Sequence, residues 1–214
     1  MGDVDWGTVA ILVGVLVPSV ILHEVSHGLV AYLFGDDTAK RAGRLTLNPI
    51  AHIDPFGTLI LPLILSLSGL GAFGYAKPVP VTPGKLRRPR EQSLYVSLIG
   101  PVVNVALALL AALLLSLLTT TVSRGNVILL DGEFSRILFY FGLVNVILAV
   151  FNLLPIPPLD GSALVERWLP ARYWPTWSKV RQWGFGIVLL VVFVLPGGLS
   201  FAFEPAVDLW SRLL

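Results

Sequence analysis

Four stretches of this sequence are long and apolar enough to cross a lipid bilayer, and no other feature constrains the fold so strongly. A spanning helix needs about 20 mostly apolar residues. Only 13% of the 214 residues are charged, against about 25% in a typical soluble domain. The sequence therefore predicts an all-α integral membrane protein with a bundle of about four to six transmembrane helices. The four stretches are residues 7–34, 93–118, 137–159 and 183–203.

A fifth apolar stretch, residues 56–70, is shorter than the roughly 20 residues that a spanning helix needs. It leads into a Pro- and Gly-rich run over 71–83, which is typical of an extended strand or hairpin. Cytoplasmic loops are enriched in Lys and Arg. The basic clusters at 40–44 and 77–90 fall on the same side only if residues 56–70 enter and leave the membrane on one side. We therefore favour a membrane re-entrant element ending in a β-hairpin or loop over a full span.

In this topology the segments 7–34 and 137–159 run parallel, from outside to inside. Each carries its unusual polar residues in its C-terminal part. We expect these polar groups to meet on the cytoplasmic side of the membrane.

The first apolar segment contains an HExxH motif, formed by His23, Glu24 and His27. Histidines four residues apart share one helix face and can bind one zinc ion, and the glutamate can act as general base on a water molecule. Ionisable groups inside a spanning helix cost about 2.5–3.5 kcal/mol each on insertion scales and are functional by default. The alternatives are a chance motif and a metal-free proton relay. The relay is disfavoured because no further carboxylates mark a path through the helices.

Catalytic zinc normally has three protein ligands and an open position, so a third ligand must come from elsewhere. The candidates are His52, Asp54 and Asp160. Asp160 is the best of them, because prolines break its helix at membrane depth and the parallel topology puts it on the side of the HExxH motif. Its alternative role is to cap the next helix. For His52 and Asp54 a turn, with Asp54 bonding the backbone near Pro55, is favoured over direct zinc binding. Either residue could still orient a zinc ligand.

Three amides remain in the apolar segments. Asn104 and Asn145 are predicted to form hydrogen bonds between helices. Asn152 precedes Asp160 by eight residues and could face the same cavity, where its amide would stabilise the oxyanion of a tetrahedral intermediate.

With these motifs in place, the sequence resembles the site-2 protease family of intramembrane zinc metalloproteases, in the short bacterial and archaeal form that is little more than a catalytic core. An HExxH motif followed by a proline-rich Leu-Asp-Gly at the end of a later membrane helix is highly specific. The resemblance covers about residues 20–165 and rests on the motifs at 23–28, 35–55, 76–81, 100–104 and 152–161.

The resemblance implies the roles of the site residues. His23, His27 and Asp160 match the ligands of one zinc ion per chain, Glu24 the catalytic base, and Asn152 a stabiliser of the transition state. The run at 73–83 looks like the family's re-entrant β-region, which receives the substrate. Its expected substrate-binding residues are Gly74, Ala76, Pro78 and Val79.

The implied function is hydrolysis of peptide bonds in or near transmembrane segments of other membrane proteins. The partners are then a transmembrane substrate and membrane lipid, in the plasma membrane of a prokaryotic cell. The net charge of +2 is too small for a nucleic-acid binder. A regulatory membrane partner and the oligomeric state stay open. The alternatives from other classes are a zinc transporter and an inactive zinc-binding scaffold.

The whole chain, residues 1–214, is interpreted as one transmembrane domain with an extra C-terminal helix at 183–203. The tail at 204–214 has the pattern of a short amphipathic helix, with Leu209, Trp210, Leu213 and Leu214 at the membrane interface. A frayed terminus is the alternative.

Overall fold

The structure, a computed structural model, describes residues 5–61, 64, 75–118, 132–194 and 199–214. Within these ranges three helices are long and apolar enough to cross a membrane. They are α1 (Trp6–Leu33), α4 (Pro89–Leu118) and α5 (Gly132–Leu153). The described residues are mostly helical and contain no strand, which confirms a helical membrane protein. They account for three of the predicted four to six spans.

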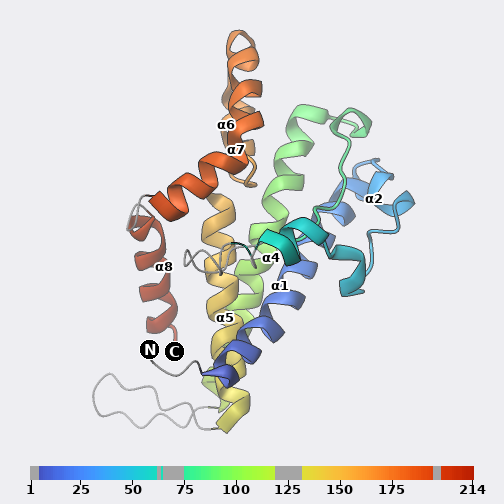
Figure 1. Ribbon diagram of the computed structural model, residues 1–214. Coiled ribbons are helices and arrows are strands. Elements are labelled where there is room, and N and C mark those ends of the chain that lie inside the picture. The colour runs from blue at the N-terminus through green and yellow to red at the C-terminus, as the bar shows by residue number, and fades with distance from the viewer. Residues whose placement is uncertain (1–4, 62–63, 65–74, 119–131, 195–198) are drawn as a thin grey trace.

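The three long helices pack into one bundle (Figure 1). α1 and α5 run in the same direction, as the charge pattern predicts, and α4 runs the opposite way in contact with both. Asp5 begins α1 by accepting hydrogen bonds from the backbone N–H groups of Gly7 and Thr8, which satisfies donors that have no partner within the helix.

Small side chains let α4 approach its neighbours closely. Gly100, Asn104 and Ala108 are buried at intervals of four residues, which places them on one face of the helix. Ala111 and Ala112 continue this face and contribute to a core cluster with Leu138 of α5. Small residues at such interfaces are the usual means of helix association in membranes, because lipid provides no hydrophobic driving force between helices.

Shorter helical elements flank the bundle, and residues 75–82 run between them as extended chain. The predicted β-hairpin therefore has no strand in its described part. Its remaining part, with most of the 56–70 stretch, lies outside the described residues. The short elements are α2 (Thr38–Arg41), η1 (Pro49–His52), η2 (Pro55–Ile60), η3 (Pro83–Lys85), α6 (Ser162–Trp168) and η4 (Ala171–Tyr173).

The predicted boundaries of the C-terminal helix, 183–203, are wrong. Helix α7 spans Trp174–Val194 and helix α8 spans Ser200–Arg212. The hydropathy window missed the polar first two turns of α7. It also ran through the Pro-Gly-Gly sequence at 196–198, which is unfavourable in a helix interior.

The tail does form a helix with one apolar face, but Trp210 does not lie at the membrane interface. It is only 2% exposed and packs against α5 in the core cluster of Leu115 and Leu138. A Cβ at Gly142 of α5 would overlap the Trp210 ring. The missing side chain at Gly142 therefore leaves a notch in the surface of α5, and the Trp210 ring fills this notch. Helix α8, which carries Trp210, lies beside α5 in Figure 1.

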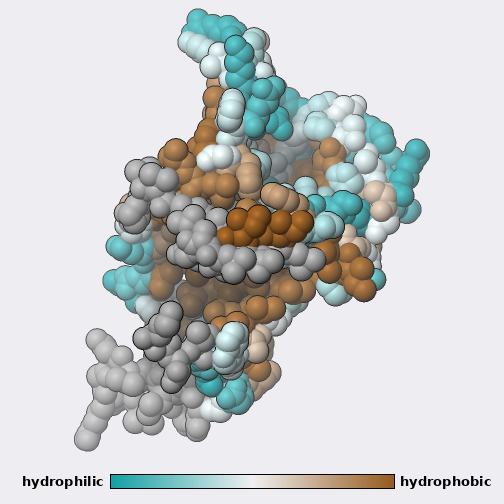
Figure 2. Space-filling view, viewed as in Figure 1, coloured by the Kyte–Doolittle hydropathy of each residue, from teal (hydrophilic) through white to brown (hydrophobic). Residues whose placement is uncertain are grey.

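Hydrophobic side chains gather across the middle of the face shown in Figure 2, whereas hydrophilic ones gather at the α6–α7 end and over α2. Many large apolar side chains of α1 and α4 are exposed, among them Val13, Val102 and Leu113. An exposed apolar band between polar ends matches a helix bundle whose solvent is the bilayer.

Candidate metal centre

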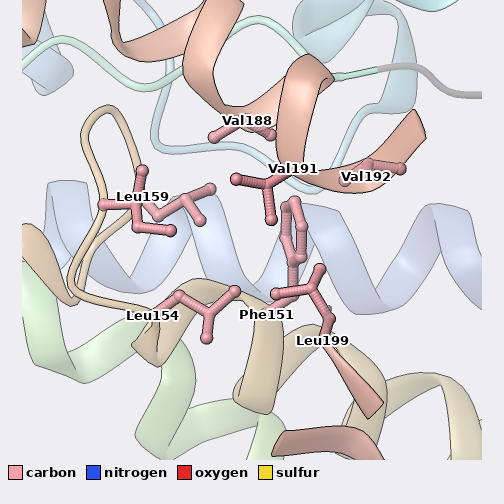
Figure 3. A pocket seen from close by; sticks show the side chains of 8 residues that line it. Phe151, Leu154, Leu159, Val188, Val191, Val192 and Leu199 are labelled. Carbon is pink, nitrogen blue, oxygen red and sulfur yellow. The ribbon is translucent and has the colours of Figure 1, made fainter. Parts of the chain in front are cut away.

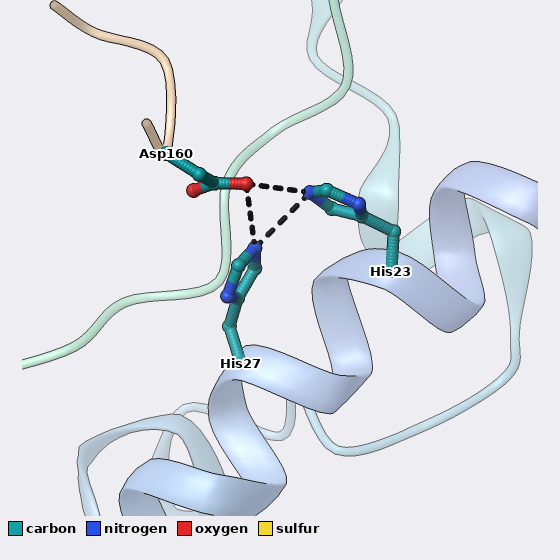
Figure 4. A group of neighbouring side chains, drawn as sticks. All are labelled: His23, His27 and Asp160. Atoms are coloured by element: carbon teal, nitrogen blue, oxygen red, sulfur yellow. Dashed lines mark hydrogen bonds and ion pairs between the residues drawn. The ribbon is translucent and has the colours of Figure 1, made fainter. Parts of the chain in front are cut away.

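Two histidines and one aspartate meet where the C-terminal part of α1 faces the loop after α5 (Figure 4). The Nε2 atoms of His23 and His27 are 3.1 Å apart. Asp160 Oδ2 lies 3.0 Å from His23 Nε2 and 3.3 Å from His27 Nε2. The structure thus brings together the three residues that the sequence predicts as zinc ligands, with their ligand atoms in a nearly equilateral triangle.

Both histidines project from one face of α1, and Gly100 of α4 lies directly against them. A Cβ at position 100 would be 2.5 Å from His27 Nε2 and 2.6 Å from His23 Cε1. Only glycine leaves room for the two rings at this crossing of α1 and α4. The rings are buried, with exposed fractions of 5% for His23 and 8% for His27.

Asp160 reaches the histidines because α5 ends early. The helix stops at Leu153, where the prolines of the following loop prevent its continuation. The backbone N–H of Gly161 then donates to the Asn152 carbonyl over 2.6 Å, which closes the loop onto the end of α5. A Cβ at Gly161 would overlap the Leu153 carbonyl, so this closure requires glycine.

Helix α7 supports the loop from the other side (Figure 3). Leu154 and Leu159 pack with Val188 of α7 in a buried cluster. A Cβ at Gly184 would lie 2.5 Å from the Pro157 carbonyl oxygen. The carboxylate of Asp160 is therefore held by a loop that is packed between α5 and α7.

The hydrogen bonds behind the rings fix which nitrogen carries the proton. His23 Nδ1 lies 2.6 Å from Asn104 Oδ1, and His27 Nδ1 lies 2.5 Å from the Val96 carbonyl oxygen. Because both partners are acceptors, each Nδ1 must donate. When both rings are neutral, the two Nε2 atoms direct lone pairs at each other and at Asp160, whose buried Oδ2 then finds no hydrogen-bond donor among the described residues.

Three lone-pair atoms facing one another repel unless a cation lies among them. Two neutral imidazoles and a carboxylate are a common ligand set for catalytic zinc, with a fourth position left open. Ligand atoms at about 2.0–2.1 Å from a tetrahedral ion are separated by about 3.3–3.4 Å. The observed separations of 3.0–3.3 Å are close to this value, so the residues fit zinc.

Glu24 is tied to the extended segment. The backbone N–H of Val79 donates to Glu24 Oε2 over 2.8 Å. The segment is held in turn by hydrogen bonds from Lys77 N–H to the His52 carbonyl and from Arg44 Nη2 to the Lys77 carbonyl. Residues 75–82 therefore run beside the HExxH helix and contact its glutamate.

The other predicted site residues lie outside this cluster. His52 is buried and its Nε2 donates to the Thr46 carbonyl, whereas Asp54 accepts from the Gly57 N–H in a turn. The amide of Asn152 donates to the Leu148 carbonyl of its own helix. Gly74 lies outside the described residues.

Asp36 fastens the extended segment to the end of α1. It is fully buried and accepts hydrogen bonds from the Thr38 N–H, the Thr38 hydroxyl and the Thr82 N–H. Burial alone would raise the pKa of this carboxyl, but the hydrogen bonds outweigh burial and hold the pKa below its usual value.

The fold and the cluster together define a class: a helical membrane protein with a His-His-Asp group that could hold a metal ion beside an HExxH helix, which is the arrangement of a membrane metallopeptidase. The family model described as Peptidase family M50, which includes site-2 proteases, matches residues 10–195. The chain therefore belongs to this family and is a membrane-embedded metallopeptidase.

Several relatives carry concordant names. The chain is 42% identical over 194 residues to "Putative zinc metalloprotease YwhC" of Bacillus subtilis, a match that covers 87% of this chain and 81% of the relative. It is 34% identical to "Putative zinc metalloprotease Rip2" of Mycolicibacterium smegmatis, over 87% of this chain and 67% of the relative. It is 31% identical to "Putative zinc metalloprotease MJ0611" of Methanocaldococcus jannaschii, over 81% and 75%. No solved structure gives a significant match.

Sequence reasoning gave no role at the site to Gly100, Arg44 or Asp36, and it treated Asn104 only as a link between helices. One signal was available. Gly100 and Asn104 are four residues apart in an apolar helix, so they must share a face, and a glycine beside a buried amide marks a close approach.

Proposed function

We propose that this chain is an intramembrane zinc metalloprotease that hydrolyses peptide bonds in or near transmembrane segments of other membrane proteins, with His23, His27 and Asp160 as the zinc ligands. The observation that carries the proposal is the triangle of three lone-pair atoms with separations of 3.0–3.3 Å. Family membership supports the same chemistry.

Glu24 is proposed as the general base. A bound zinc ion would supply Lewis-acid chemistry, by polarising the scissile carbonyl and acidifying a water molecule. Glu24 would take the proton from the attacking water and pass it to the leaving amine. The Val79 N–H fixes one carboxylate oxygen of Glu24, which leaves the other free to accept the proton. Asn152 is proposed as a donor to the oxyanion, because its backbone adjoins Gly161.

The extended segment is the proposed substrate site. A spanning helix hides its peptide bonds in its own hydrogen bonds, so it must unwind before cleavage. An unwound stretch can then add to a backbone edge by strand pairing. Gly74, Ala76, Pro78 and Val79 are proposed to contact it, since the described part of this segment runs beside Glu24.

The orientation follows from the basic residues. Lys and Arg gather before α4 and again from the end of α6 to the first turns of α7, at Arg167, Arg172, Lys179 and Arg181. This distribution supports a cytoplasmic location for the end of the bundle that carries the metal centre. We propose the plasma membrane of a prokaryotic cell, a re-entrant 56–70 stretch and a single domain. The described residues favour neither a transporter nor a scaffold.

The test measures zinc per chain in detergent and cleavage of a reconstituted transmembrane substrate. The wild type should hold about one zinc per chain, and Asp160→Ala should hold much less. Asp208→Asn, which alters an exposed ion pair on α8, is the matched control and should keep its zinc.

Glu24→Gln completes the design. It should keep the zinc but lose at least about a hundredfold in turnover, which is the contribution expected of a general base. Full zinc in Asp160→Ala would refute the ligand set. Unchanged cleavage by Glu24→Gln would refute the role of the glutamate.

A further inference from the structure

A row of buried polar side chains leads from His23 into the middle of the bundle. His23 Nδ1 lies 2.6 Å from Asn104 Oδ1 of α4, and Asn104 Nδ2 donates to Asn145 Oδ1 of α5 over 2.8 Å. Asn145 Nδ2 donates in turn to Ser19 Oγ of α1, over 2.9 Å. Asn104, Asn145 and Ser19 are all fully buried, so water cannot substitute for any of these partners.

Backbone carbonyls beside Asn145 and Ser19, at the end of the row away from His23, fix the direction of every hydrogen bond in the row. Asn145 Nδ2 also donates to the Phe141 carbonyl over 2.8 Å, and the Ser19 hydroxyl donates to the Val15 carbonyl over 2.7 Å. A backbone carbonyl can only accept. Asn145 must therefore point its nitrogen towards Phe141 and Ser19, and its oxygen towards Asn104.

The same constraint passes to His23. Since Asn145 offers an oxygen, Asn104 must face it with its nitrogen and must face His23 with its oxygen. An amide oxygen accepts only, so His23 Nδ1 has to carry a proton, and in the neutral ring Nε2 then carries the lone pair. The protonation of the ring is thus set two side chains away, by Asn145.

The second histidine provides a contrast within the site. His27 Nδ1 donates to the backbone carbonyl of Val96, which no side-chain substitution removes. His52 Nε2 donates to the Thr46 carbonyl, so that ring has the opposite tautomer. The chain contains only these three histidines, and only the tautomer of His23 depends on side chains.

We propose that Asn145 is a positioning residue for the metal centre, which acts through Asn104 to hold His23 in the tautomer that presents Nε2 as a ligand. This inference rests on the proposed role of His23 in binding zinc. It goes beyond that role, because it assigns a function to a residue on a third helix that does not touch the cluster.

The first measurement reads the tautomer directly. Ring ¹⁵N chemical shifts of histidine-labelled, zinc-free full-length protein in detergent, recorded at a pH at which the rings are neutral, distinguish a protonated nitrogen from a bare one, and His52 serves as the reference for the opposite form. The wild type should show His23 protonated at Nδ1. Asn145→Leu should show a mixture of both tautomers at His23 and an unchanged His27.

The second measurement is zinc affinity by chelator competition. Removing a partner that orients a metal ligand typically weakens binding 10–100-fold. We expect about a tenfold loss for Asn145→Leu and up to about a hundredfold loss for Asn104→Leu. If Asn145→Leu does not fold, Asn145→Ala gives the same comparison with a smaller side chain.

Leu138→Ala is the matched control. It removes a buried side chain from the same helix, so it should lower the melting temperature without changing zinc affinity or the His23 tautomer. Wild-type tautomer and zinc affinity in Asn145→Leu would overturn this inference alone. A wild type that binds no zinc would overturn the proposed function as well.

Discussion

The backbone N–H of Val79 donates to Glu24 Oε2 over 2.8 Å. This bond joins the residue expected to move the proton to the segment expected to hold the substrate. It also limits how the carboxylate can turn, because one of its two oxygens is occupied.

The first prediction concerns this bond. Val79→Pro removes the donor, and a hydrogen bond to a charged group is worth about 1.5–3 kcal/mol. We expect kcat to fall about ten- to a hundredfold with zinc content unchanged. Val79→Ala, which keeps the N–H, should lose much less. Equal rates for the two variants would show that the bond does not orient Glu24.

The second prediction concerns the glycine behind the two histidines. A Cβ at position 100 would be 2.5 Å from His27 Nε2, so Gly100→Ala must displace the ring. Zinc affinity should fall at least about tenfold, as it does when a ligand's support is lost. Gly14→Ala is the control, because nothing lies within 4 Å of its Cβ. It should keep zinc and leave stability unchanged or slightly higher. Equal zinc affinity for both variants would refute the steric argument.

The third prediction concerns the contact between Gly142 of α5 and Trp210 of α8. Gly142→Ala should cost about 1–3 kcal/mol, the usual range for overpacking, because its Cβ would overlap Trp210. Trp210→Leu alone should also destabilise, since it leaves a cavity. The double variant should be more stable than the sum of the two losses predicts, because the smaller side chain relieves the overlap. If the losses of stability of the two single variants, measured by thermal unfolding, simply add in the double variant, then Gly142 does not form a notch for Trp210.

The fourth prediction concerns acid. The pKa of Asp36 is held below its usual value of 3.8 in the folded chain. Its contribution to stability is therefore complete above pH 3.8 and is lost as pH falls through the lowered pKa of the folded state. Asp36→Asn should lower the free energy of unfolding by about 1–3 kcal/mol at neutral pH. It should also reduce the fall of the melting temperature with decreasing pH in the acid range. Thr38→Val, which removes one donor, should act in the same direction but less. An unchanged pH dependence of the melting temperature in Asp36→Asn would refute this stabilising role of the carboxylate.

The cluster could be anticipated from sequence for a simple reason. The spacing of His23 and His27 fixes them on one helix face, and the prolines before Asp160 mark a helix that ends inside the membrane. Parallel directions for α1 and α5 then bring the two ends together, and those directions followed from the basic residues alone. Each step depends on local sequence and needs no knowledge of packing.

Other features depend on packing and could not be read in this way. The link between Asn104 and Asn145 requires the rotation of α4 and α5 about their own axes, which hydropathy leaves undetermined when a helix is apolar all round. The burial of Trp210 requires the notch at Gly142, more than 60 positions earlier in the sequence. The boundary of α7 was missed because its first two turns are polar, and a hydropathy window records only the apolar remainder.

Two consecutive residues of α7 touch the two non-helical segments beside the metal centre. Gly184 packs against Pro157 in the loop that carries Asp160, and the Phe185 ring meets the Tyr75 ring edge-on, with centroids 5.4 Å apart. A rotation of α7 about its axis would thus displace both the loop of a proposed metal ligand and the segment proposed to hold the substrate. If both proposed roles hold, the alignment of the substrate and the geometry of the metal centre depend on the same helix, and a substitution that shifts α7 should impair both together.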